Sequence, residues 1–159
     1  MATTERLRFL LAEREAKPWR DELAGVLADL PDAPMVETPP ASDAKIRAIL
    51  AAWGAASGAE PERRTFTSAS SVADHLATAA GQPGDELWIL PGPQPQVGVL
   101  TLVAPLQPAL VSVLTTWNRE GFVVLNPTRG DVLLVDLLGT DPFVVEVQAR
   151  HARADRDAS

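Results

Sequence analysis

Three apolar segments joined by short turns, in the last third of the chain, constrain the fold most strongly. They cover residues 122–125, 132–137 and 143–148. A parallel crossover needs a dozen or more residues, so connections this short predict antiparallel hairpins. The middle segment begins Val132-Leu133-Leu134-Val135 and is therefore apolar on both faces. We expect it to lie centrally, covered on each side by helices or by a second copy of the chain, which leaves a homodimer possible.

Two further strands are predicted at residues 86–90 and 97–103, separated by a proline-rich loop. A helix should follow Pro105 and Pro108, because the residues after them have the spacing of a core-facing stripe. These residues are Leu106, Leu110, Val113, Leu114 and Trp117. The second half of the chain thus predicts a sheet of about five strands and one helix.

The first half has helical patterns instead. Leu7, Leu10 and Leu11 share one helical face, and Pro18 is expected to end that helix and begin another. The prolines of residues 31–40 indicate a linker, after which Ser42 suits the N-cap of a third helix. A fourth should open at Ser71, whose hydroxyl precedes an acidic residue by three positions as in a capping box.

These elements together predict an α+β domain with the order ααα-α-ββ-α-βββ. The antiparallel sheet would pack against helices. Residues 1–31 are expected to form an N-terminal helical arm, residues 42–149 the main α+β domain, and residues 150–159 a flexible polar tail.

Composition excludes several kinds of site. The chain of 159 residues has no cysteine and two histidines, so disulfides, thiolate catalysis and cysteine-type zinc are absent, and we expect no metal or cofactor. No apolar run reaches the roughly 18 residues of a membrane helix. The N-terminus lacks the pattern of a secretory signal. A cytoplasmic location without membrane contact is therefore expected.

The formal net charge of −7 bears on the partner. Nucleic-acid binding relies on basic side chains that neutralise phosphates, so this balance argues against it. A basic protein would instead be attracted. Arginine is used far more often than lysine, and alanine and proline are abundant, which suggests a high-GC bacterial source.

Four evenly spaced carboxylates are the most tempting catalytic or metal-binding group: Asp131, Asp136, Asp141 and Glu146. Carboxylates can bind calcium or magnesium, or act as an acid/base pair. However, Asp131 and Asp136 are separated by an odd number of residues within one strand, which predicts opposite faces. Turn and surface roles are therefore favoured for this group.

His75 is the other candidate for catalysis, with Asp74 beside it and Ser70 and Ser71 just before it. Adjacent helical residues diverge by about 100°, so Asp74 cannot orient His75 as a catalytic triad requires. The serines suit helix caps better than a nucleophile. His151 lies in the polar tail, where catalytic positioning is not expected.

The absence of a catalytic motif favours a non-catalytic protein-binding domain of a bacterium, of the immunity, antitoxin or secretion-accessory type. Its acidic surface would attract a basic partner. Trp19 is the tryptophan we expect to be partly exposed, and tryptophan is enriched at binding hot spots. The expected partner-binding residues are Trp19, Asp136, Asp141 and Glu146. The alternative is a small-molecule-binding or enzymatic α+β domain, with a pocket that uses Asp136, Glu146 or His75.

Overall fold

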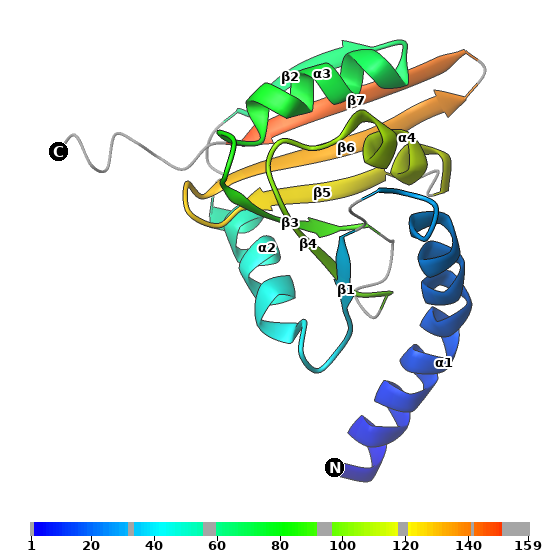
Figure 1. The fold of residues 1–159 in the computed structure, drawn as a ribbon. Coiled ribbons are helices and arrows are strands. Elements are labelled where there is room, and N and C mark those ends of the chain that lie inside the picture. Colours follow the sequence, from blue (N-terminus) through cyan, green and yellow to red (C-terminus); the bar gives the residue numbers. More distant parts are fainter. Residues whose placement is uncertain are drawn as a thin grey trace, which may run out of the picture.

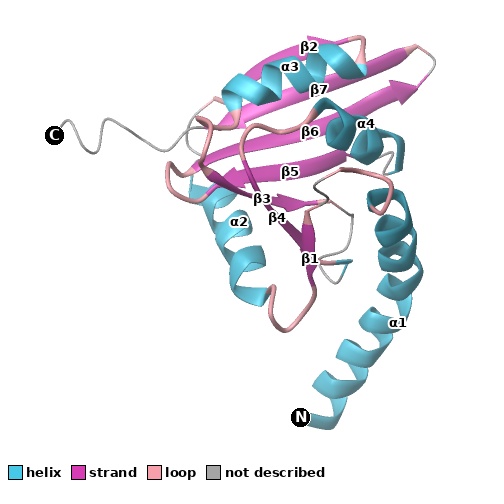
Figure 2. Ribbon diagram, viewed as in Figure 1, coloured by secondary structure: helices cyan, strands magenta, loops and turns pink. Residues whose placement is uncertain are grey.

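The structure is a computed structural model that describes most of the chain. The described residues are 2–31, 34–55, 60–91, 97–117, 121–140 and 142–150. They form one antiparallel sheet of seven strands with four helices (Figures 1 and 2). The predicted α+β class with an antiparallel sheet is confirmed, with seven strands where about five were expected.

The strands, in sheet order, are β1 (Met35–Glu37), β4 (Val99–Val103), β3 (Glu86–Leu90), β5 (Gly121–Asn126), β6 (Asp131–Thr140), β7 (Phe143–Arg150) and β2 (Glu62–Phe66). The helices are α1 (Ala2–Leu27), α2 (Asp43–Ala55), α3 (Ala69–Ala79) and α4 (Pro108–Trp117). The apolar segment that the sequence placed centrally is β6, which pairs with β5 and β7.

The two strands that sequence reasoning missed, β1 and β2, are the outermost strands of the sheet. β1 has three residues and lies in the segment expected to be a linker. β2 begins Glu62-Arg63-Arg64 and is mostly exposed, and these polar residues predict no strand. Short or charged strands are typical of sheet edges, where charge discourages pairing with other chains. Neither has the apolar alternation that identifies a strand in the sequence.

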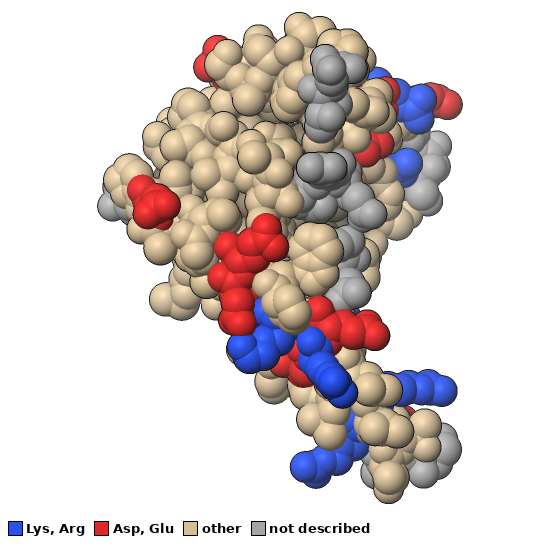
Figure 3. Space-filling view, turned by 90° about the vertical axis from the view of Figure 1, so that its right-hand side faces the viewer, with Lys and Arg blue, Asp and Glu red and all other residues tan. Residues whose placement is uncertain are grey.

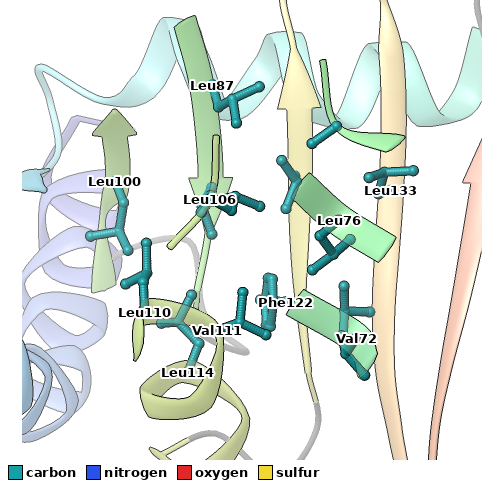
Figure 4. Close-up of a cluster of buried hydrophobic side chains, with 14 of the residues drawn as sticks. Val72, Leu76, Leu87, Leu100, Leu106, Leu110, Val111, Leu114, Phe122 and Leu133 are labelled. Carbon is teal, nitrogen blue, oxygen red and sulfur yellow. The ribbon is translucent and has the colours of Figure 1, made fainter. Parts of the chain in front are cut away.

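Each face of the sheet has its own hydrophobic core. α3, α4 and the second half of α1 pack on one face, where side chains of α3 and α4 point toward those of the strands (Figure 4). α2 packs on the other face through Ile46 and Ile49, against Val99, Leu125 and Val132. Because neighbouring residues alternate between faces, β6 contributes to both cores: Val132 to the second, and Leu133 to the first.

α1 is one continuous helix through Pro18, so the expected break at this proline is wrong. Proline cannot donate the hydrogen bond to the carbonyl four residues earlier, which here belongs to Arg14. Both Arg14 and Pro18 are exposed, so water can solvate that carbonyl. In the turns of α1 that follow Pro18, Leu23 and Leu27 are buried in the core and hold the helix in place.

α3 begins three residues before the position that the sequence suggested. Its N-cap is Ser68, which has an extended backbone and whose hydroxyl oxygen accepts a hydrogen bond from the backbone N–H of Ser71 at 3.2 Å. The expected capping box at Ser71 is therefore wrong, and Ser71 lies within the first turn. Several serines in this segment can cap a helix, and the extended backbone at Ser68 decides which of them does so.

Gly121 is required where β5 meets β6. Its φ of +113° is unfavourable for residues with a side chain, and a methyl group here would overlap the backbone carbonyl oxygen of Val135. This close approach brings Gly121 directly opposite Asp136.

Within the described part of the chain, no helix is both long and apolar enough to cross a membrane.

Candidate functional site

The side chains of β6 and β7 on the α2 side of the sheet form the candidate site. Strand pairing sets Asp136 opposite Glu146 and Leu134 opposite Gln148. Val144 follows in the same alternation, two residues before Glu146. Leu134, Asp136, Val144, Glu146 and Gln148 therefore share one face of the sheet, which we call the acidic face.

α2 leaves the acidic face open. Its core covers the sheet from β4 to the start of β6, where Val132 is fully buried. Leu134 and Val144 lie beyond this core and belong to neither buried cluster of the described residues. Both are partly exposed. The same sheet face is thus covered by a helix over one half and presents apolar side chains over the other.

Two carboxylates lie at the centre of this open half. Directly opposite residues in antiparallel strands have Cβ atoms about 5 Å apart, and like charges in this arrangement are destabilising. Gln148 donates a hydrogen bond from Nε2 to Glu146 Oε1 at 2.8 Å. The exposed Arg63 of β2 lies on the same face, directly opposite Gln148 and next to Glu146. Among the residues that the structure describes, however, no Lys or Arg forms an ion pair with Asp136 or Glu146.

Three of the four evenly spaced carboxylates are described by the structure, and it brings two of them together, Asp136 and Glu146. Asp131 lies on the other face of β6, is 7% exposed, and forms an ion pair with Arg129 at 3.3 Å. Asp141 lies outside the described residues. Within the described part of the chain, no group of three His, Cys, Asp or Glu residues could hold a metal ion. Register alone, set by the β6–β7 hairpin, makes neighbours of Asp136 and Glu146.

Trp19 is 37% exposed and lies on α1, on the opposite face of the sheet from the acidic face. Its ring meets that of Trp117 edge to face, with the centroids 5.8 Å apart. This geometry is favourable for an aromatic pair. Trp19 therefore packs α1 onto α4 with one edge, while the rest of the ring faces solvent.

His75 lies on α3, also on the opposite side of the sheet. Its ring is 5.1 Å from that of Phe66. Burial, followed by the positive charge of Arg64, lowers the pKa of His75 below its ordinary value of 6.5, and Glu62 opposes this shift. His75 is therefore separated from Asp136 and Glu146 by the sheet, and the three do not line one pocket.

A groove of about 660 Å³ lies between α4, β4 and the segment that leads into β1. Its walls are mainly apolar and include Leu30, Met35, Val103 and Leu110. Among the described residues that line it, there is no carboxylate and no histidine. Its volume suits a small ligand, but these described residues supply no titratable group for acid/base chemistry.

A polar cluster that sequence reasoning missed joins β1 to α2. Lys45 Nζ lies 2.6 Å from Glu37 Oε1 and 2.7 Å from Thr101 Oγ1, and it lies over the ring of Trp88 at 5.2 Å. The hydrogen bond from Lys45 lowers the pKa of Glu37 below its ordinary value. Lys45, Glu37 and Thr101 form hydrogen bonds with one another across β1, β4 and α2, so we assign the cluster to holding the edge strand.

The projecting end of α1 is a second exposed surface. In Figure 1 this helix runs away from the sheet toward its N-terminus, and Figure 3 shows charges of both signs along it. Leu7, Leu10 and Leu11 are 56%, 52% and 49% exposed. With Arg14, they have the i, i+3, i+4, i+7 spacing of one helical face. We call Arg6, Leu7, Leu10, Leu11 and Arg14 the outer stripe.

Sequence reasoning found the shared face of the three leucines but did not predict their exposure. Only the packing of α1 shows which end of the helix projects from the sheet.

Comparison with models of known families, with curated proteins and with solved structures found no significant match to this chain.

Proposed function

We propose that this chain is a non-catalytic bacterial protein-binding domain, of the immunity, antitoxin or secretion-accessory type, that receives a basic segment of its partner on the acidic face. The single observation that carries the proposal is the pairing of Asp136 with Glu146 on an open, partly apolar half of the sheet.

Two directly opposed carboxylates, neither of which is in an ion pair, destabilise the free protein by up to about 1 kcal/mol. A partner that places Lys or Arg between them removes this repulsion on binding. Binding sites often keep such locally unfavourable arrangements, because the favourable interaction with the partner forms only in the complex. Leu134 and Val144 flank the carboxylates and supply apolar area for a segment that carries apolar residues beside its cation.

The net charge of −7 supports the same class of partner. A negative protein attracts a basic one over a distance of about 10 Å at ordinary ionic strength, which raises the association rate. Binding of this kind weakens as salt is added. Trp19 is a candidate for a separate contact with the partner, because part of its ring faces solvent.

The alternative, a small-molecule-binding or enzymatic domain, has less support. Its expected residues, Asp136, Glu146 and His75, are divided between two faces of the sheet, and the groove of about 660 Å³ contains none of them.

The test removes the two charges without changing side-chain size. The wild type and the double variant Asp136→Asn/Glu146→Gln are used to capture partners from the native host. A control, Asp43→Asn/Asp74→Asn, removes two partly or fully exposed carboxylates on helices. We expect a basic protein to be captured by the wild type and the control, and to be lost with the double variant and with added salt.

At protein concentrations where both proteins are monomeric, the double variant should also unfold at higher urea concentration than the wild type, because the repulsion has been removed. Capture of the same partner by the double variant would contradict the proposed site. Failure of the wild type to bind any basic protein would contradict the proposed function.

A further inference from the structure

We propose that the acidic face of one copy is covered by the outer stripe of α1 from a second copy. This inference rests on the proposed function, since it uses the same acidic face: the outer stripe covers that face in the free protein, and a basic partner competes with it. Four observations carry it: the exposure of the stripe, its charge, its dimensions, and its position relative to the acidic face of its own chain.

The first observation is that α1 has apolar side chains on both sides where it projects. Phe9, seven residues before the buried Ala16, continues the core-facing side and is 43% exposed. The three leucines of the outer stripe lie on the opposite side. Charged residues lie between these two apolar sides, but the exposed leucines and Phe9 leave apolar area uncovered, as is typical of a segment that contacts a partner.

The second observation is that the stripe is basic in an otherwise acidic chain. Arg6 and Arg14 form no ion pair among the residues that the structure describes. Two of the acidic residues later in α1 are paired within the helix: Glu13 with Arg20 at 3.1 Å, and Asp21 with Lys17 at 2.6 Å. The stripe therefore presents leucines together with guanidinium groups that form no ion pair. The acidic face presents Leu134, Val144 and two carboxylates that form no ion pair, with Arg63 of β2 beside them.

The third observation is that the dimensions agree. A helix with its side chains is about 10 Å wide, which corresponds to two strands spaced about 4.8 Å apart. Leu10 and Arg14 are separated by about 6 Å along α1, and Leu134 and Asp136 by about 7 Å along β6. A leucine of the stripe can thus lie on Leu134 while Arg14 reaches the carboxylate pair. Arginine suits this position because its guanidinium group has five N–H donors and can donate hydrogen bonds to two neighbouring carboxylates.

The fourth observation is that the stripe cannot reach the acidic face of its own chain. The second half of α1 packs on the α4 side of the sheet, whereas the acidic face lies on the α2 side. α1 also lies beside the end of the sheet formed by β1, and the acidic face lies toward β2 (Figure 1). The contact therefore needs a second copy, and two-fold symmetry would make it twice.

The experiment measures the mass of the full chain in solution by light scattering and sedimentation, across a range of concentrations. For a 17.0 kDa chain, we expect a dimer in the wild type. Arg14→Glu and Glu146→Lys should each weaken the dimer about tenfold or more, because each sets like charges against each other. Their combination, Arg14→Glu/Glu146→Lys, restores opposite charges and should recover most of the affinity.

Arg8→Glu is the matched control, since it makes the same charge change on an exposed position of α1 outside the stripe. It should leave the dimer unchanged. Circular dichroism and urea unfolding of every variant confirm that the fold is kept, which is expected because the changes are at exposed or partly exposed positions.

Three results would overturn the inference. A wild type that stays monomeric would do so, and the proposed function would stand if capture of another basic protein still depended on Asp136 and Glu146. A dimer insensitive to Glu146→Lys would assign the stripe to a helix–helix contact. Binding of a monomeric wild type to anionic lipid vesicles, lost in Arg14→Glu, would assign the stripe to a lipid surface.

Discussion

At the scale of single residues, His75 illustrates how position in the fold controls chemistry. It has the neighbours in sequence that suggest catalysis, yet the helix turns Asp74 away and the ring packs beside Phe66. Burial and the charge of Arg64 both favour the neutral ring. The consequence is a dependence of stability on pH that needs no catalytic role.

The pKa of His75 in the folded protein lies below 6.5, the ordinary value that applies to the unfolded chain. As the pH falls below 6.5, the unfolded chain takes up the proton first, so the free energy of unfolding falls until the pH has passed the lowered folded pKa. Above pH 6.5, this contribution to stability is fully present. His75→Gln should show a smaller loss of stability between pH 7 and pH 5 than the wild type.

The measurement is urea unfolding of both proteins at a series of pH values. Glu37 contributes in a separate window, because its lowered pKa causes loss of stability only as the pH falls below its ordinary value of 4.5. Equal slopes for wild type and His75→Gln between pH 7 and pH 5 would show that the ring does not titrate differently on folding.

At the scale of elements, α1 shows that a local signal can be overridden by packing. Pro18 disfavours the middle of a helix, but the buried Leu23 and Leu27 on the same helix outweigh this cost. Full burial of a leucine side chain contributes about 1.5–3 kcal/mol, and a proline in a helix interior costs about 3 kcal/mol. α1 therefore continues through Pro18, and the proline lowers the free energy of unfolding locally.

Pro18→Ala should remove that penalty and raise the free energy of unfolding by about 1–3 kcal/mol. Lys17→Ala is the control, because it changes the neighbouring residue and breaks only the exposed ion pair with Asp21. It should alter stability by less than about 0.5 kcal/mol. Urea unfolding measures both. No gain from Pro18→Ala would mean that α1 already accommodates the proline without cost.

At the scale of the whole molecule, α1 belongs to two environments. Its second half contributes Ala16, Leu23 and Leu27 to the core on the α3 and α4 side of the sheet. Residues 3–11 are exposed throughout. The first part of α1 can therefore serve binding without affecting the core, whereas the second part is needed for folding.

Two deletions separate these contributions. Removal of residues 1–11 should change the free energy of unfolding of the monomer by less than about 0.5 kcal/mol, because the described side chains that are lost, those of residues 3–11, are all exposed. Removal of residues 1–27 exposes the core and deletes two buried leucines, a loss of several kcal/mol against a total stability of about 5–15 kcal/mol. We expect this shorter chain to be unfolded or insoluble, as measured by circular dichroism and the yield of soluble protein. A stable fold without residues 1–27 would show that α1 is an independent arm.

The amino-acid sequence by itself determined the antiparallel class and the strands β3, β4, β5, β6 and β7. The connections between β5, β6 and β7 are turns of a few residues, and such turns allow no parallel connection. It did not reveal β1 and β2, since edge strands need not bury apolar residues. Tertiary structure alone decided which carboxylates meet. The register of β6 and β7 sets Asp136 against Glu146, and one residue of slippage would have moved either to the other face. The packing of α1 likewise decided which leucines remain exposed, because a helical face is buried only where another element reaches it.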